Sequence, residues 1–297
     1  MELKKILRAA TIKKYRLHNL LAFFVDNSSF ILPNGYELEF NSKNKKDVEK
    51  LFEFSLINGV IFFDSDGFWR YKGNTIILPN GIKLYINKFH PTIFKETFLY
   101  DIHFTDFNLE GKVVIQAGGF TGDTALYYSY RGAKVFSFEP DPNNFFQAIS
   151  NIKLNPDLSN NIVMKNYAIG SDGEILFPLD QEGNGGSSVY EIQNRKTIKV
   201  KSVTIDTILS EFNIGNPYLL DLDIKGNEFK IINDKSISKF QIVRIEYSTL
   251  IDKKKIGDRK DIITKLEEYG FNKFRIFKHN DINFDLTEHG TIEAIRA

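Results

Sequence analysis

Short apolar runs alternate with helical patterns from about residue 112 to the end of the chain. Helical patterns lie near 122–131, 142–154, 226–233 and 258–269. Strand–helix alternation of this kind predicts an α/β fold, with a parallel sheet covered by helices on both faces. Seven runs have the length and the Val/Ile/Phe content of buried strands: KVVIQA (112–117), AKVFSF (133–138), IVMKNYAI (162–169), YLLDLD (217–222), QIVRIEY (241–247), KFRIF (273–277) and TIEAIRA (291–297).

The N-terminal part has a different pattern. Residues 30–41 (FILPNGYELEFN) and 76–87 (IILPNGIKLYIN) each place a Pro-Asn-Gly turn between short runs of apolar and polar residues. Asn-Gly supplies the positive φ angles of tight hairpin turns, so we expect two hairpins, separated by a helix near 44–57. The pattern predicts a small α+β accessory domain over residues 1–92 and a second domain over residues 93–297.

Residues 1–26 predict a single amphipathic helix. Basic side chains dominate one face, and the other carries the apolar residues Leu3, Ile6, Leu7, Ala10 and Leu17. Such a helix can touch a membrane surface or a polyanion. A solvated basic face on a packed helix is the plainer interpretation, and from sequence alone it is the one we favour.

Composition narrows the class of protein. The chain has 297 residues, 42% hydrophobic and 26% charged, which is typical of a globular protein with a large core. Its net charge of +1 argues against a strongly basic nucleic-acid binder. Cysteine is absent, which excludes disulfides, Cys-based metal sites and a thiol nucleophile. We expect no transmembrane segment and no secretory signal, and hence a cytoplasmic protein.

A glycine-rich turn, VVIQAGGFTGD (113–123), follows the first strand of the α/β region. Gly118, Gly119 and Gly122 let backbone approach a ligand closely, and the next helix offers unpaired N–H groups. The following strand ends in Glu139, 21 residues after Gly118, where a carboxylate accepts hydrogen bonds from ribose hydroxyls. The spacing is neither GxGxxG nor a P-loop, so the turn predicts a nucleoside-containing cofactor without naming it.

Several segments in order, over roughly residues 110–250, resemble the FkbM-type S-adenosylmethionine-dependent methyltransferases. They are VVIQAGGFTGDTAL, VFSFEPDPNNF, NYAIGSDGE, GGSSVYEI with VKSVTIDTIL, LDLDIKGNE and VRIEY. The resemblance implies a Rossmann-like seven-stranded methyltransferase sheet with helices on both faces and S-adenosylmethionine as cofactor. It also implies that the methyl acceptor is a hydroxyl of a sugar or of another small metabolite.

The resemblance implies which residues bind the cofactor. They are Gln116, Gly118, Gly119, Phe120, Gly122, Asp123, Glu139, Asp141, Ala168 and Asp221. Three positions depart from the family pattern. Gln116 stands where the family has an acid that helps to hold the amino-acid end of the cofactor. Asp221 and Lys225 carry charges opposite to those of the family signature, which suggests an ion pair with its signs exchanged.

Methyl transfer from a sulfonium mainly needs an oriented nucleophile and exclusion of water, and a hydroxyl nucleophile also needs a base. Asp223 is the first catalytic candidate, because it follows the fourth strand at the edge where such sheets bind ligands. A cap on the helix that begins near Gly226 explains Asp223 equally well. Glu246, on the next strand, is the second catalytic candidate, and Glu228 is assigned to stabilising the first turn of a helix.

The five histidines show no metal-binding spacing, so no metal site is predicted. His103, just before the α/β region, is a candidate for the substrate side. The Gly/Ser loop at 182–188 lies within an inserted hairpin over 174–203 and can cover a site. Basic residues over 253–260 predict a solvated helix entry or a contact for an anionic acceptor.

Two alternatives remain open from the sequence. Gln116 and the reversed charges allow an inactive scaffold that keeps the methyltransferase fold and binds a partner. A nucleotide-sugar or NAD-dependent enzyme can use a similar sheet, although the glycine spacing argues against it. The expected partners are a small-molecule or glycan acceptor and a second copy of the chain, and no nucleic acid is expected.

Overall fold

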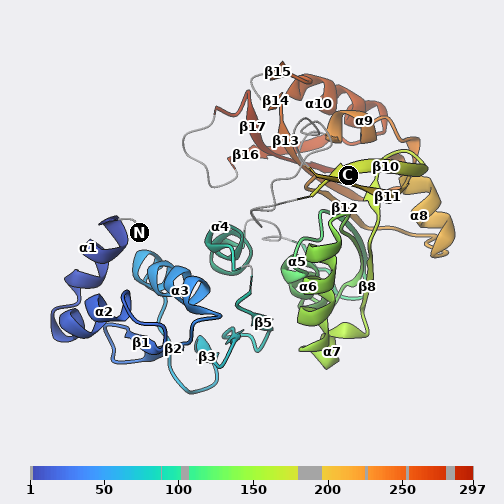
Figure 1. Cartoon of the computed structure of the whole chain (residues 1–297). Helices are drawn as coiled ribbons and strands as arrows, with labels where there is room; N and C mark the ends of the chain where they lie inside the picture. The colour runs from blue at the N-terminus through green and yellow to red at the C-terminus, as the bar shows by residue number, and fades with distance from the viewer. Residues whose placement is uncertain are drawn as a thin grey trace. The chain divides into compact units, whose positions relative to one another are not determined.

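The computed structural model describes residues 3–87, 89–101, 107–179, 196–224, 227–251, 254–278 and 285–296. The chain divides into two compact units, Met1–Tyr100 and Asp101–Ala297, both drawn in Figure 1. The division falls at residue 100, where the sequence pattern placed it at 92. The Gly/Ser loop at 182–188 lies outside the described residues, as do His103, Lys225 and Lys253.

The first unit combines helices with two small antiparallel sheets, β1-β2 and β3-β4-β5 (blue to teal in Figure 1). Both expected hairpins and the helix between them are present. The elements are α1 (Leu3–Thr11), η1 (Lys13–Tyr15), α2 (Arg16–Ala22), β1 (Ser28–Ile31), β2 (Glu37–Phe40), α3 (Lys45–Asn58), β3 (Arg70–Lys72), β4 (Thr75–Ile77), β5 (Lys83–Tyr85), α4 (Pro91–Lys95) and η2 (Glu96–Tyr100).

The two hairpin turns are built in the same way. In each, the glycine N–H bonds back to the leucine carbonyl three residues earlier, Gly35 to Leu32 at 2.8 Å and Gly81 to Leu78 at 2.9 Å. The glycines have φ of 89° and 87°, and neither asparagine has a positive φ. Only the glycine therefore uses the left-handed region, as in a type I turn followed by a left-handed residue. The similar segments 30–41 and 76–87 therefore form two hairpins with the same turn.

The N-terminal segment is not the single helix that the sequence predicted. The chain turns at Ile12 between α1 and η1, and α2 follows. Asn19 links α2 to β1, because its buried side chain donates to the Ile31 carbonyl at 2.9 Å and accepts from the Ile31 N–H at 2.8 Å. This link between α2 and β1 sets the direction of α2. Leu17, expected on the packed face, is 71% exposed.

The second unit contains a seven-stranded sheet in the order β16-β17-β13-β12-β6-β7-β8 (Figure 1). All seven predicted strands are in it. The elements are β6 (Val113–Ala117), α5 (Asp123–Tyr130), β7 (Lys134–Phe138), α6 (Pro142–Lys153), α7 (Pro156–Ser159), β8 (Ile162–Lys165), β9 (Ala168–Ile169), β10 (Gly173–Pro178), β11 (Thr197–Val203), α8 (Ile205–Glu211), β12 (Leu219–Leu222), α9 (Glu228–Ile231), η3 (Lys235–Lys239), β13 (Ile242–Ser248), β14 (Leu250–Ile251), β15 (Lys254–Lys255), α10 (Arg259–Glu268), β16 (Lys273–Phe277) and β17 (His289–Ile295).

Two details of this sheet differ from the prediction. The sheet is mixed, because β17 runs antiparallel to both β13 and β16. The strand expected over 162–169 is divided into β8 and β9, and β9 joins a separate sheet with β10 and β11. Asn166 lies at the break and donates to the carbonyls of Glu139 and Pro140 at 2.8 and 2.9 Å. These bonds hold the chain against the end of β7, so it leaves the large sheet there.

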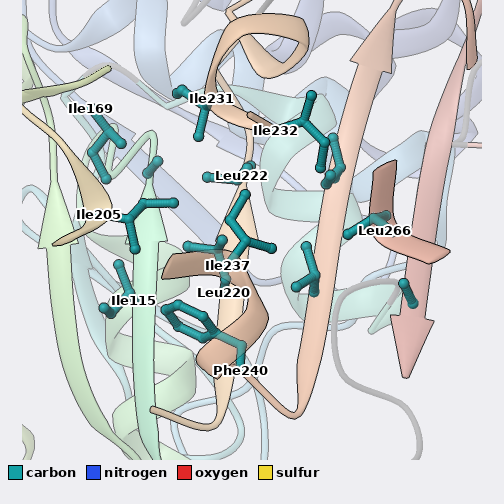
Figure 2. Packing of buried hydrophobic residues seen from close by; sticks show 14 of the residues in the cluster. Ile115, Ile169, Ile205, Leu220, Leu222, Ile231, Ile232, Ile237, Phe240 and Leu266 are labelled. Carbon is teal, nitrogen blue, oxygen red and sulfur yellow. The ribbon is translucent and has the colours of Figure 1, made fainter. Parts of the chain in front are cut away.

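Apolar side chains cover both faces of the seven-stranded sheet. On one face, strand residues such as Ile115 and Leu220 pack against residues of α8, α9, η3 and α10 (Figure 2). On the other face, Val114 and Leu219 pack with Ala125 and Tyr128 of α5. Helices therefore cover both faces, as predicted for an α/β fold. Among the described residues, no helix is long and apolar enough to cross a membrane.

A row of polar side chains crosses the sheet at one level on the α5 face. In register from β7 to β16, the row is Ser137, Gln116, Asp221, Arg244, Glu293 and Arg275. Arg244 is 1% exposed and lies 3.9 Å from carboxylate oxygens of both Asp221 and Glu293. The Tyr128 hydroxyl donates to Asp221 at 2.7 Å, and burial beside that carboxylate raises the pKa of Tyr128 well above its ordinary value. Arg244 thus balances two buried acids in the middle of the sheet.

We expect Arg244→Met to lower the free energy of unfolding by about 3–5 kcal/mol, because it removes the buried cation beside Asp221 and leaves Glu293 with Arg275 alone. Arg275→Met is the matched control, since Arg275 pairs with the same Glu293 but its side chain is 43% exposed. The control should cost less than about 1 kcal/mol. Urea unfolding followed by circular dichroism at pH 7 measures both. Equal losses in the two variants would contradict a special role for the buried arginine.

Candidate functional site

The direction of the strand order reverses between β6 and β12. From β6 the chain builds outward to β7 and β8, whereas from β12 it builds the other way to β13 and β17. In open α/β sheets, ligands bind at the carboxyl ends of the strands at such a reversal. The two strands stay together past their last paired residues, because the Asp223 N–H donates to the Ala117 carbonyl at 3.0 Å. The glycine turn begins directly after this bond.

The three glycines of the turn are packed too tightly for side chains. A Cβ on Gly118, whose φ is +92°, would lie 2.0 Å from the Asp223 carbonyl oxygen. A Cβ on Gly119 would lie 2.6 Å from side-chain atoms of Ser137 and Met164. Gly122, with φ +78°, faces Ala148 of α6 at 3.1 Å. The turn therefore brings bare backbone to the sheet edge and starts α5 there, where the first N–H groups of a helix attract negative charge.

Glu139 connects the end of β7 to the glycine turn. One carboxylate oxygen accepts the Phe120 N–H at 2.8 Å and the other accepts the Asp141 N–H at 2.9 Å. The residue is only 6% exposed. Burial raises the pKa of Glu139 to about 8, and the two N–H bonds oppose part of that rise. A carboxyl group has about four acceptor positions, so Glu139 can support the turn and still accept bonds from a ligand.

The neighbours of Glu139 have local structural roles. Phe120 has a φ of +40°, which is uncommon for a residue other than glycine, and its N–H is the one held by Glu139. Asp141 caps α6 by accepting the N–H groups of Asn143 and Asn144. Asp123, buried in the first turn of α5, accepts a bond from Thr121 at 3.4 Å. These residues shape the rim of the turn.

Gln116 and Asp221 lie one level below the sheet edge, in the polar row. The Gln116 amide accepts from Ser137 at 2.8 Å and donates to the Gly118 carbonyl at 3.4 Å, so it steadies the turn from beneath. Asp221 pairs with Arg244 at 3.9 Å. An acid at position 116 would lie in register beside the buried Asp221, and like charges placed opposite each other destabilise a sheet. This accounts physically for Gln116.

The expected adenine-side segment follows β8. Ala168 is buried in β9, paired with Ser202 of β11 rather than with the large sheet. Asn166, which was not among the predicted site residues, is nearer to the glycine turn, because its amide donates to the Glu139 carbonyl. The sequence signal for Asn166 was its place in NYAIGSDGE, where it precedes the residue that was selected.

The two catalytic candidates lie side by side at the carboxyl edge. The register that pairs Leu222 with Ile245 places Asp223 and Glu246 at the same level, one residue further along. Asp223 is exposed, and the Glu246 side chain is 23% exposed. The helix that Asp223 was alternatively expected to cap is α9, which begins at Glu228 with Asn227 as its N-cap residue.

His289 lies beside Glu246 and was not predicted as a site residue. Its Nε2 is 3.7 Å from a Glu246 carboxylate oxygen, and its Nδ1 is 3.0 Å from the Ser248 hydroxyl. The pairing of Ser248 with His289 across β13 and β17 creates this group. Residue spacing in the sequence does not predict this group, because β13 and β17 are far apart in the chain. Among the described residues, no group of three His, Asp or Glu side chains is placed to hold a metal ion.

A nucleoside-containing cofactor fits the described edge. Backbone free of side chains at Gly118 and Gly119, the N-terminus of α5 and the buried carboxyl of Glu139 can hold a ribose and a charged amino-acid group. The exposed Asp223 and the Glu246–His289–Ser248 group lie along the same edge, over β12 and β13. The edge therefore has two candidate halves, a cofactor half over β6 and β7 and an acceptor half over β12 and β13.

Two solved structures of similar fold share little sequence with this chain. The chain is similar to magnesium protoporphyrin IX methyltransferase from Synechocystis PCC 6803 at 13% identity and TM-score 0.37, over 69% of this chain and 78% of that one. It is similar to precorrin-6y C5,15-methyltransferase from Geobacter metallireducens GS-15 at 10% identity and TM-score 0.34, over 63% and 82%. At such TM-scores the fold assignment rests on the strand order itself.

Sequence comparison is more specific. No curated protein matches the chain. The profile of the methyltransferase FkbM domain matches residues 116–273, more than half of the chain. The match includes the glycine turn, Glu139 and Glu246, and it confirms the resemblance found in the sequence motifs. The chain therefore belongs to the methyltransferase FkbM domain family.

Proposed function

We propose that the protein is an S-adenosylmethionine-dependent methyltransferase that methylates a hydroxyl of a sugar or another small metabolite. The observation that carries the proposal is the glycine turn at the strand reversal, with Gly118 against the Asp223 carbonyl and Glu139 holding the Phe120 N–H. Family membership supports methyl transfer. The hydroxyl acceptor is supported by the basic and acidic side chains grouped over β12 and β13.

Each part of the site has a task in this proposal. When bound, S-adenosylmethionine supplies an electrophilic methyl group on a sulfonium. Glu139 binds the ribose hydroxyls, and the turn from Gly118 to Gly122 binds the amino-acid end. Gln116 steadies the turn through the Gly118 carbonyl. Because these groups are fixed by the sheet before any ligand arrives, little reorganisation is needed on binding.

The acceptor half orients the hydroxyl and takes its proton. Asp223, exposed at the end of β12, accepts a hydrogen bond from the acceptor and fixes its direction. His289 is the base that removes the hydroxyl proton. Glu246, 3.7 Å from Nε2, stabilises the imidazolium that forms, and Ser248 holds the ring from its other nitrogen. This use of Glu246 differs from a direct catalytic role, since it acts through His289.

Ligand binding tests the cofactor. S-adenosylmethionine and S-adenosylhomocysteine at about 100 times Kd should stabilise the protein by about 2.7 kcal/mol in thermal unfolding, and NAD should not. Gly118→Ala should abolish this stabilisation, because the new methyl group meets the Asp223 carbonyl. Gly215→Ala is the control, since a Cβ there meets nothing within 4 Å.

Gly119→Ala provides a second test if Gly118→Ala does not fold, because its crowding involves the ends of side chains that can move. Stronger stabilisation by NAD than by S-adenosylmethionine would overturn the cofactor assignment. Binding without any formation of S-adenosylhomocysteine across a broad panel of hydroxyl acceptors would favour an inactive scaffold instead.

Cofactor affinity should rise with pH toward about 8. The pKa of Glu139 is raised to about 8, so the carboxyl is largely protonated at neutral pH. Ribose hydroxyls donate to the ionised form, so binding lowers this pKa and releases a proton below pH 8. Affinity should therefore increase by up to tenfold per pH unit between pH 6 and 8 and level off above. Calorimetry in two buffers of different ionisation enthalpy measures the released proton.

Glu139→Gln should remove the pH dependence together with much of the affinity. The variant also loses an acceptor for one of the two N–H groups that hold the turn. Its thermal unfolding without ligand shows how much of the loss comes from the turn. Wild-type binding that does not change from pH 6 to 8 would contradict a proton-coupled role for Glu139.

We expect His289→Ala to lower the rate of methyl transfer by about 10²–10⁴-fold with cofactor affinity unchanged, since it removes the base. Added imidazole should restore part of the rate, which a purely structural histidine would not allow. Ser248→Ala is the matched control: it removes only the 3.0 Å contact to Nδ1 and should cost less. S-adenosylhomocysteine release with any acceptor that supports turnover measures the rates. A full rate in His289→Ala would remove His289 from the mechanism.

A further inference from the structure

The N-terminal segment carries a concentrated positive charge. Between residues 3 and 25 the sequence contains six lysines and arginines and no aspartate or glutamate. The net charge of the whole chain is only +1, so the remainder offsets this segment. Arg8 pairs with Glu53 of α3. Lys4, Lys13, Lys14 and Arg16 are all exposed.

Large apolar side chains of the same segment also face outward. Leu17, Leu21 and Phe24 are 71%, 56% and 70% exposed. Their spacing of four and three residues places them on one side of α2 and its last turn, which continues to Phe24 through a bond to the Leu21 carbonyl at 2.9 Å. Leu7 of α1 is 58% exposed as well. Leu17, Leu21 and Phe24 therefore form an apolar stripe, and the basic residues Lys13, Lys14 and Arg16 directly precede it in the chain.

The packing of the segment explains why the stripe faces outward. The residues that α1, α2 and the turn between them bury include Ala9, Ile12, Asn19 and Ala22. The Asn19 bonds to Ile31 fix the orientation of α2, so Leu17 and Leu21 cannot turn inward without breaking them. A solvated face on a packed helix would carry polar residues here. The exposed leucines and Phe24 are a feature that a solvated basic face does not explain.

We propose that the surface formed by Leu17, Leu21 and Phe24, with Lys13, Lys14 and Arg16, binds the anionic surface of a lipid bilayer. Leucine and phenylalanine on one side of a helix with lysine and arginine around them are the features of helices that lie in the headgroup region. The apolar side chains enter the boundary of the acyl chains, and the basic side chains meet lipid phosphates. This surface acts independently of the proposed methyl transfer.

The charge and the exposed apolar residues of this surface favour an anionic bilayer over a second copy of the chain or a nucleic acid. A symmetric contact with a second copy of the chain would bring the same basic residues together, which is unfavourable. A nucleic acid would use the basic side chains, but it would leave the leucines in water. An anionic bilayer satisfies both parts of the surface, because it offers phosphate charge and an apolar interior within a few ångströms.

Sedimentation of the full-length protein with vesicles tests the proposal. Vesicles of phosphatidylcholine with about a third phosphatidylglycerol should bind the wild type, and vesicles of phosphatidylcholine alone should bind at least about tenfold more weakly. The double variant Leu17→Ser/Leu21→Ser and the double variant Lys13→Glu/Lys14→Glu should each lower the partition coefficient at least about tenfold. All four positions are exposed, so both variants should fold.

Matched controls lie in the second unit. Phe146 of α6 is 65% exposed, and Lys153 and Lys235 are exposed. Phe146→Ser and the double variant Lys153→Glu/Lys235→Glu should bind anionic vesicles as the wild type does. Unchanged thermal stability in every variant separates lost binding from lost folding.

Three results would overturn the proposal. Wild-type protein that stays in the supernatant with anionic vesicles would exclude the lipid partner. Binding that survives Leu17→Ser/Leu21→Ser would show charge attraction without insertion. A dimer in sedimentation equilibrium that Leu17→Ser/Leu21→Ser converts to monomer would assign the stripe to a second copy of the chain instead.

Discussion

The buried charge of Arg244 is the constraint on which the second unit depends. A guanidinium in the middle of a sheet is tolerated only with acids beside it, and Asp221 on β12 and Glu293 on β17 supply them. Bringing Glu293 to Arg244 fixes the register of β17 against β13. That register sets His289 opposite Ser248 and next to Glu246. The proposed acceptor half of the site is therefore positioned by the row of buried charges one level beneath it.

The row of polar side chains that contains Arg244 also gives a physical reason for Asp221 and Gln116, two of the residues that depart from the family pattern. Asp221 is engaged by Arg244 and Tyr128, so its reversed charge serves the sheet. Gln116 is neutral beside it and holds both Ser137 and the Gly118 carbonyl. Neither change leaves a buried charge without a partner. Gln116 and Asp221 thus support the sheet beneath the glycine turn, and Gly118 within the turn is crowded by the Asp223 backbone.

Local patterns in the sequence were sufficient for most of the fold. The seven strands, both hairpins and the glycine turn depend on residues that are close in the chain, such as Pro33, Asn34 and Gly35. The Arg244 row and the pairing of His289 with Glu246 depend on registers between strands that are distant in sequence. Residue spacing in the sequence cannot predict contacts between such distant strands. The sequence therefore predicted Glu246 as a candidate without its neighbour His289.

The N-terminal segment shows that the composition of a whole chain does not predict the charge and exposure of one segment. A net charge of +1 argues against a polybasic binder as a description of the whole chain. This net charge does not reveal that residues 3–25 contain six basic residues, which are offset only by acidic residues elsewhere in the chain. Apolar content misleads in the same way, because Leu17 and Ala9 both count as hydrophobic although one is 71% exposed and the other is buried. Which residues are free to meet a partner is decided by Asn19, a polar residue whose two bonds to Ile31 orient the helix.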